Sequence, residues 1–201
     1  MFKDAPISSR YPYEMYYRIF ACKFLPSNLD RILYLDPDII VKGDLTSLYN
    51  QEFNNNLYVA TSNVKMFLKR INQIKNGASK DTEYINTGVL LMNLELLRCE
   101  QNEEDVFDYI SKHYYSMTLP DQDIISTLYG NRVILVDKLI YNLSDRTMLF
   151  HNLSPSNIGF QIDLDWVKKN TIIIHYFGRN KPWQKNYIGQ LKIYYDKYRI
   201  D

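Results

Sequence analysis

The chain has 201 residues, of which 46% are hydrophobic and 23% are charged. This composition is typical of a folded globular protein and excludes a largely disordered one. The 24 basic and 23 acidic side chains give a net charge of +1, so the sequence lacks the basic bias of a nucleic-acid-binding protein. Two cysteines provide neither a disulfide framework nor a metal cluster, and they favour a reducing, intracellular setting.

Apolar side chains recur with helical spacing in some segments and form short buried runs in others. Because strands alternate with helices, the sequence indicates an α/β fold organised as one domain over residues 1–201. In chain order, the expected helices are 13–24, 45–49, 64–74, 103–115, 121–129, 161–169 and 187–198, and the expected strands are 31–35, 57–61, 88–94, 133–136 and 172–176.

The segment 31–42, RILYLDPDIIVK, ends an apolar strand with two aspartates, Asp36 and Asp38. The carboxyl ends of strands are where ligands bind in open α/β sheets. Pro37 favours a bend that turns both carboxylates towards one point. Two convergent carboxylates suit Mg²⁺ or Mn²⁺, which substrate phosphates also hold. On its own, the same pattern also fits a solvated turn.

Two further polar groups lie at the ends of predicted elements in the middle of the chain. Asn86, Thr87 and Gly88 precede the strand 89–92, and Asp121 and Gln122 open a helix. Asn86 fits a turn as well as a ligand site. Asp121 fits a simple helix N-cap.

A fourth polar group follows the strand 171–174 near the end of the chain. It contains His175, Gly178 and Lys181. Glycine and lysine after a strand end would let the backbone approach a diphosphate and neutralise it. A core histidine and a surface lysine are the alternatives for His175 and Lys181.

Together and in this order, these residues resemble glycosyltransferase family 8, the retaining sugar-nucleotide enzymes that include glycogenin-like and bacterial lipopolysaccharide galactosyltransferases. The resemblance covers nearly the whole chain. It is carried by Tyr16-Tyr17-Arg18, Leu25-Pro26, residues 29–38, residues 84–94, Asp121-Gln122-Asp123, His175-Tyr176-Phe177-Gly178 and Lys181-Pro182-Trp183.

The resemblance implies a GT-A type nucleotide-diphospho-sugar transferase fold, with a mixed, mostly parallel sheet flanked by helices. It implies a UDP-sugar donor and a divalent ion, Mn²⁺ or Mg²⁺. The positions matched to the family's functional residues are Asp36, Asp38 and His175 for the metal, Gly178 and Lys181 for the diphosphate, and Arg18, Asn86, Gly88, Asp121 and Gln122 for the transferred sugar, with Asp121 and Gln122 as the catalytic candidates.

The implied activity is transfer of a hexose from the UDP-sugar to a glycan, lipid-linked glycan, lipopolysaccharide or protein acceptor, with bacterial cell-surface polysaccharide as the setting. The implied location is cytoplasmic, with peripheral association at the inner membrane surface as a further option. We expect Asn86 and Asp121 to line a concave sugar site beside the metal. Acceptor contacts are expected from the variable loops 65–82 and 144–163.

Family members usually carry a longer segment before the position of Tyr16, which 15 residues precede here. The comparison predicts a partial GT-A domain that lacks the first strands of the nucleotide-binding half. An incomplete sheet exposes an apolar edge, so we expect self-association and weak UDP binding. The alternative is a truncated, inactive relative that binds sugars or a partner.

Two other enzyme classes use paired carboxylates. A haloacid-dehalogenase-like phosphatase would need a hydroxyl residue soon after Asp38, where Ile39 and Ile40 stand instead. A glycoside hydrolase uses two carboxylates but needs neither a metal-linked histidine nor a diphosphate lysine. A requirement for UDP would separate the hydrolase from the transferase.

Overall fold

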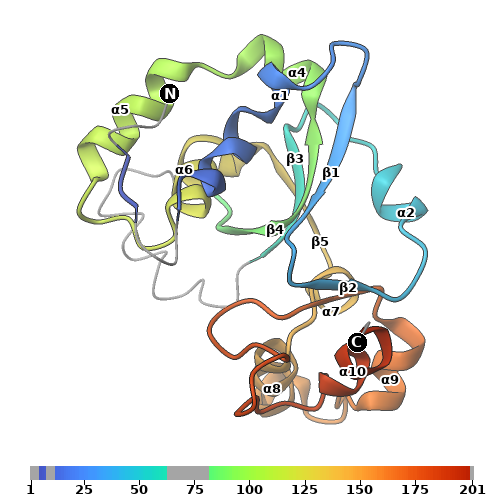
Figure 1. Cartoon of the computed structure of the whole chain (residues 1–201). Helices are drawn as coiled ribbons and strands as arrows, with labels where there is room; N and C mark the ends of the chain where they lie inside the picture. Colours follow the sequence, from blue (N-terminus) through green and yellow to red (C-terminus); the bar gives the residue numbers. More distant parts are fainter. Residues whose placement is uncertain (1–4, 8–11, 63–81, 200–201) are drawn as a thin grey trace. The chain divides into compact units, whose positions relative to one another are not determined.

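The computed structural model describes residues 5–7, 12–62 and 82–199 (Figure 1). They form two compact units. The first unit takes its described residues from Met1–Tyr34 and Gln51–Leu135, and the second from Leu35–Asn50 and Val136–Asp201. That residues 1–201 act as one domain stays a prediction.

The first unit is built around a four-stranded sheet with the strand order β1-β4-β3-β5. The strands are β1 (Arg31–Leu35), β3 (Tyr58–Ser62), β4 (Ile85–Asn93) and β5 (Val133–Val136). The helices are η1 (Tyr13–Phe20), α1 (Ala21–Phe24), α4 (Leu94–Glu100), α5 (Glu103–His113), α6 (Pro120–Tyr129) and η2 (Gly130–Arg132). Helices η1, α1, α5 and α6 lie on one side of this sheet in Figure 1.

Strand β4 forms the centre of the first core. Every residue from Ile85 to Met92 is buried, as expected for an inner strand covered on both faces. Its side chains Ile85, Leu90 and Met92 belong to one cluster with Phe20 of η1 and Ile124 of α6. Burial of each such side chain contributes about 1.5–3 kcal/mol, so β4 is a main source of stability in this unit.

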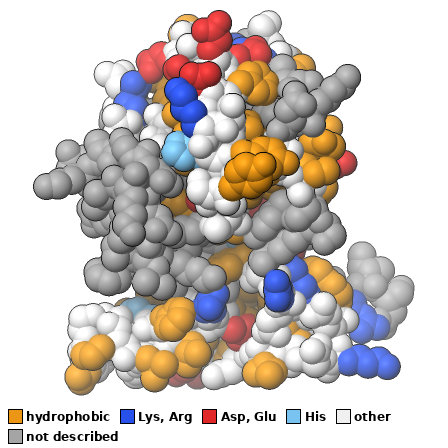
Figure 2. All heavy atoms as spheres, turned by 90° about the vertical axis from the view of Figure 1, so that its left-hand side faces the viewer, with side chains coloured by type: hydrophobic (Ala, Val, Ile, Leu, Met, Phe, Trp, Pro, Cys, Tyr) orange, Lys and Arg blue, Asp and Glu red, His pale blue; other side chains and the backbone are white. Residues whose placement is uncertain are grey.

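The charges of α5 match the dipole of the helix. Its first turn carries Glu103, Glu104 and Asp105, and its last turn carries Lys112 and His113. Acidic side chains are favoured near a helix N-terminus and basic ones near its C-terminus. The order of charges along α5 therefore stabilises the helix. Figure 2, which views the molecule from the left-hand side of Figure 1, shows acidic side chains gathered at the top of that face.

The pairing of β3 with β4 is antiparallel and contains a bulge. Ala60 pairs with Leu90, whereas the next residue, Thr61, pairs with Asn86. Residues 87–89 of β4 are therefore extra residues between these two pairs. Bulges redirect side chains and often occur near functional sites. The redirected segment includes Thr87 and Gly88 from the polar group singled out in the sequence.

The second unit contains a two-stranded sheet and a cluster of short helices. The strands are β2 (Ile39–Val41) and β6 (Ile173–His175). The helices are α2 (Thr46–Tyr49), α7 (Lys138–Tyr141), α8 (Asp145–Leu153), η3 (Pro155–Asn157), α9 (Leu164–Asn170) and α10 (Lys192–Tyr198). A separate hydrophobic core, which includes Leu143, Val167, Ile174 and Leu191, joins β6, α7, α8, α9 and α10.

Strands β2 and β6 run antiparallel, with Ile39 opposite His175 and Val41 opposite Ile173. An isolated parallel bridge joins Leu143 to Ile174. The β3–β4 and β2–β6 ladders are both antiparallel, whereas the bridge between Leu143 and Ile174 is parallel. Strand pairs of both directions are therefore present, as expected for a mixed sheet.

The strands expected at 31–35 and 133–136 are confirmed as β1 and β5. The polar segment 86–88 was placed before a strand, but β4 begins at Ile85 and contains it. The expected helix 187–198 begins only at Lys192. Tyr187 and Ile188, which precede it, have the spacing of a helix in the sequence, but their backbone is not helical.

Three further expectations concern helices and loops. The helix expected at 13–24 is present as the 3₁₀ helix η1 followed by α1. The region 144–163, expected to be a variable loop, contains α8. The helix expected at 64–74 lies outside the described residues. None of the helices in the described part of the chain combines the length and apolar character needed to cross a bilayer.

Candidate functional site

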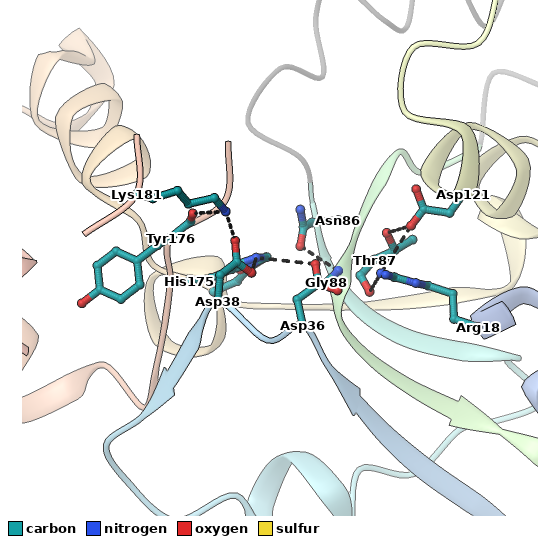
Figure 3. A network of polar contacts seen from close by, with 11 residues as sticks. Arg18, Asp36, Asp38, Asn86, Thr87, Gly88, Asp121, His175, Tyr176 and Lys181 are labelled. Carbon is teal, nitrogen blue, oxygen red and sulfur yellow. Dashed lines mark hydrogen bonds and ion pairs between the residues drawn. The ribbon is translucent and has the colours of Figure 1, made fainter. Parts of the chain in front are cut away.

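Three predicted metal ligands converge in the second unit (Figure 3). His175 Nε2 lies 3.1 Å from Asp38 Oδ1 and 3.7 Å from Asp36 Oδ2. One ligand atom from each of the three residues lies within 4.8 Å of the others. Ligands that occupy neighbouring positions around a cation at about 2.1 Å lie about 3 Å apart. The spacing and the oxygen and nitrogen donors therefore fit one divalent ion such as Mn²⁺ or Mg²⁺.

The backbone brings these ligands together by two devices. Strand β1 ends at Leu35, and the turn at Pro37 separates Asp36 from Asp38. The β2–β6 ladder then sets Ile39 opposite His175, and the Tyr176 N–H donates to the Asp38 carbonyl at 2.9 Å. Backbone hydrogen bonds fix both segments. Bringing the Asp38 carboxylate and the His175 imidazole together therefore costs little further conformational entropy.

His175 is held in place by Asn142. The imidazole side chain is 1% exposed, and its Nδ1 lies 2.8 Å from Asn142 Oδ1. With that amide oxygen as acceptor, Nδ1 carries a proton and Nε2 faces the two carboxylates. Such a second contact orients a histidine for metal binding. Asn142 was absent from the sequence prediction.

Asp38 is kept ionised by its neighbours. Burial alone would raise the pKa of its carboxyl, but the hydrogen bond and charge of His175 and those of Lys181 outweigh burial and hold the pKa well below its usual range. The Lys181 ammonium donates to Asp38 Oδ2, and to the Tyr176 carbonyl at 3.0 Å. A carboxylate that stays charged at neutral pH is what a cation site needs.

Gly178 lies between His175 and Lys181 and has φ +98°, a backbone conformation that favours glycine. Among the described residues, nothing beyond the chain neighbours of Gly178 lies within 4 Å of the point where a Cβ would stand, so substitution would strain the backbone without a clash. The backbone thereby changes direction between the metal ligand and the lysine.

We expect Gly178→Ala to lower the free energy of unfolding by about 1–2 kcal/mol, because an alanine resists a left-handed backbone. Urea denaturation measures this loss. Gly43→Ala is the matched control, because Gly43 lacks a left-handed φ and its Cβ would meet Ile172 at an ordinary 3.4 Å. Equal losses for the two variants would contradict the explanation.

In the first unit, the β4 bulge is closed by its own side chains. Asn86 Oδ1 accepts a hydrogen bond from the Gly88 N–H at 3.0 Å, and the Thr87 carbonyl accepts one from Arg18 at 3.1 Å. Backbone groups that leave a ladder need such partners when they are buried. Asn86 and Gly88 are thus brought together. The Asn86 side chain therefore has a structural role in the bulge, besides any role in binding a ligand.

Arg18, Thr87 and Asp121 form a buried polar network in the same unit (Figure 3). Thr87 Oγ1 donates to Asp121 Oδ2 at 2.6 Å, and Arg18 lies 3.3 Å from that oxygen. The Arg18 guanidinium also stacks over Tyr34 at 4.2 Å. Pairing and hydrogen bonds offset much of the cost of burying both charges.

Asp121 is not the N-cap of α6, because that position is Leu119, which makes no side-chain cap hydrogen bond. Asp123 Oδ2 accepts the N–H groups of Thr118 at 2.8 Å and Leu119 at 3.0 Å, just before the helix. Asp121 instead turns its carboxylate to Thr87 and Arg18. Gln122 follows in the first turn of α6 and is half-buried.

The sequence prediction missed Asn142 and the partner role of Thr87. Thr87 was within the quoted motif, so its position pointed to it. Asn142 stands in the segment YNLS after α7, and its local pattern resembles a loop. Only the tertiary contact with His175 reveals it.

Several curated proteins with similar sequences are named as bacterial sugar transferases. The chain is 26% identical over 186 residues to a lipopolysaccharide 1,2-glucosyltransferase of Escherichia coli, covering 90% of this chain and 52% of that protein. It is also 26% identical over 186 residues to a lipopolysaccharide 1,3-galactosyltransferase of Salmonella typhimurium, with the same coverage of 90% and 52%. The chain thus spans about half the length of these relatives.

Solved structures share the fold. The galactosyltransferase LgtC in complex with donor and acceptor sugar analogues matches with a TM-score of 0.78 and 22% identity, over 98% of this chain and 70% of that one. An active-site variant of LgtC matches with a TM-score of 0.81 and 21% identity, over 98% and 70%. This likeness confirms the expected GT-A fold, with a mixed sheet flanked by helices.

The sequence model of glycosyl transferase family 8 matches residues 1–187, which is nearly the whole chain. The order of motifs from Arg18 to Lys181 agrees with that match. The chain therefore belongs to glycosyltransferase family 8.

Proposed function

We propose that this chain is a metal-dependent retaining hexosyltransferase, which moves a hexose from a UDP-sugar to a glycan, lipopolysaccharide or protein acceptor. The observation that carries the proposal is the convergence of Asp36, Asp38 and His175, with Lys181 on the same carboxylate. The relatives named as lipopolysaccharide glucosyl- and galactosyltransferases support a hexose donor.

The second unit would handle the diphosphate. Asp36, Asp38 and His175 would hold Mn²⁺ or Mg²⁺, which supplies positive charge to stabilise the charge that develops on the departing diphosphate. Lys181 would add a second positive charge there. The turn at Gly178 would let the backbone approach the phosphates closely.

The first unit would handle the transferred sugar. Arg18, Asn86, Gly88, Asp121 and Gln122 are the residues proposed for this role. The Asp121 carboxylate would favour a cationic sugar centre, and Arg18 and Thr87 fix its orientation. We assign no nucleophile to either Asp121 or Gln122.

Hydrolysis of a panel of UDP-sugars by the 201-residue chain, with and without Mn²⁺, tests the proposal. We expect release of UDP from UDP-glucose or UDP-galactose only with the ion, because without it the negative charge that develops on the departing diphosphate is not stabilised enough. Chelation with EDTA should abolish the release. Asp36→Asn should abolish it as well, whereas Asp108→Asn, at a side chain that is 70% exposed, should not.

Two outcomes would count against the proposal. Hydrolysis that is indifferent to Mn²⁺ would show that the three ligands do not serve the reaction. Sugar binding without any turnover would favour the alternative of an inactive relative that acts as a sugar- or partner-binding module. Association through a sheet edge stays a prediction that the same preparation checks by light scattering.

A further inference from the structure

Helix α8 leaves an apolar stripe exposed in the second unit. Leu149, Phe150 and Leu153 are large hydrophobic side chains, and all three are exposed. Arg146 is exposed as well and lies over the Phe150 ring at 5.7 Å. These four residues follow the i, i+3, i+4, i+7 spacing that places side chains on one face of a helix. Helix α8 lies at the left of the second unit in Figure 1, and Figure 2, which views the molecule from that side, shows hydrophobic side chains exposed along its lower part.

The loop after α8 adds two more exposed apolar side chains, Ile158 and Phe160. The loop is folded back on the helix, because the Asn152 side chain makes two hydrogen bonds of 2.8 Å with the backbone of Ile162. The Phe160 ring lies 5.3 Å from the His151 ring, edge to face. The exposed apolar side chains of the helix and the loop together form what we call the α8 patch, namely Leu149, Phe150, Leu153, Ile158 and Phe160.

The α8 patch has the area that a stable dimer needs at its centre. Its side chains are between 47% and 84% exposed, and the exposed fractions add up to about three complete side chains. At about 100–200 Å² for each apolar side chain, the patch offers about 300–600 Å². A standard interface buries about 800 Å² on each partner, and in homodimers about 65% of that area is apolar. The apolar part of such an interface is therefore about 500 Å², which matches the patch.

Few charges surround the α8 patch. Between residues 144 and 162, Asp145 and Arg146 are the only aspartate, glutamate, lysine or arginine residues. The Asp145 carboxylate accepts hydrogen bonds from the Tyr187 hydroxyl and from the Leu191 N–H, the latter at 3.0 Å. Helices that lie on a bilayer are rich in lysine and arginine, whereas this stretch has one such residue. The patch therefore suits a protein surface of low charge better than an anionic membrane.

We propose that the α8 patch is the contact between two copies of this chain, related by a two-fold axis. In such a contact the same patch meets itself, so a nearly neutral patch meets no like charge. Exposed positions at this spacing are those through which helices pack on one another. With the two α8 helices antiparallel, Arg146 near the start of one helix would lie beside the end of the other, where positive charge is favoured. The inference goes beyond the proposed function and does not depend on it.

Sedimentation velocity of the 201-residue chain, at concentrations between about 1 and 100 μM, tests the inference. We expect a reversible shift from the 24.0 kDa monomer to a particle of twice that mass as the concentration rises. The dissociation constant should lie in the micromolar range, because the apolar centre is only of standard size.

Variants of the α8 patch show whether the dimer forms there. Leu153→Glu should raise the dissociation constant by more than about 30-fold, because each dimer would bury two additional carboxylates. Ile158→Glu, in the loop, carries the same expectation. Ile193→Glu is the matched control in the same unit, because Ile193 is 51% exposed on a face of α10 that it shares with the exposed Asp196 and Lys197. It should leave the dissociation constant unchanged, and circular dichroism checks that each variant is folded.

Several results would overturn the inference. A chain that stays monomeric at about 100 μM would do so, as would a dimer that the patch variants and Ile193→Glu weaken equally. A dimer that none of the variants weakens would point to a sheet edge instead. Sedimentation with phosphatidylglycerol vesicles by a chain that does not dimerise would assign the patch to a membrane. Mn²⁺-dependent hydrolysis, measured on the same sample, keeps the two proposals apart: hydrolysis by a monomer refutes only the dimer, and a dimer without hydrolysis refutes only the proposed transfer.

Discussion

Replacing Asp36 and Asp38 together by asparagine is expected to weaken Mn²⁺ binding by more than about 100-fold. Removal of an outer-shell partner alone costs about 10–100-fold, and this double variant removes two charged ligands. The substitution keeps the side-chain shapes, so the turn at Pro37 should persist. Isothermal titration with Mn²⁺ measures the affinity, and circular dichroism checks the fold.

Two single variants sharpen that result. Asn142→Ala should weaken Mn²⁺ binding by about 10–100-fold, because it frees His175 to rotate. Lys181→Met should have the opposite sign and strengthen Mn²⁺ binding in the absence of UDP, since the ammonium that competes for Asp38 is removed. If Lys181→Met abolishes Mn²⁺ binding as the aspartate variant does, the site is collapsing and the ligand assignment fails.

Removal of the Asp121 carboxylate is expected to lower the free energy of unfolding by about 3–5 kcal/mol, the usual cost of leaving a buried charge without its partner. The side chains of Arg18 and Asp121 are only 10% and 8% exposed, so water cannot replace the lost contact. Asp121→Leu also removes the acceptor of the Thr87 hydroxyl. Urea denaturation followed by circular dichroism measures the effect.

The double variant Arg18→Met and Asp121→Leu should recover much of this stability, because it removes both buried charges. The matched control is Asp108→Ala, which breaks an exposed pair with Lys112 and should cost about 0–1 kcal/mol. A loss in Asp121→Leu no larger than that of the control would contradict the picture of a buried network.

Two strands were predictable from local pattern, although none of their residues is fully buried. Arg31–Leu35 and Val133–Val136 are short apolar runs bounded by polar residues, and both form strands with the expected bounds. Strand β2 was missed, although Ile39-Ile40-Val41 has strong strand character. The two aspartates before it suggested that the strand region had already ended.

The residues of the candidate site were easier to predict than their geometry. Residue types in order were enough to name Asp36, Asp38 and His175. The bulge in β4 depends on how Asn86 and Leu90 pair with β3, which no local pattern encodes. The contact between Asn142 and His175 joins residues 33 positions apart, so it follows from the folded second unit alone.

The β2–β6 ladder has a consequence for biosynthesis. Asp38 and His175 are 137 positions apart, so the ribosome makes both aspartates long before the histidine emerges. A nascent chain that stops short of residue 173 has β2 without β6 and lacks His175. Premature stop codons upstream of that point would therefore yield products without the third candidate ligand.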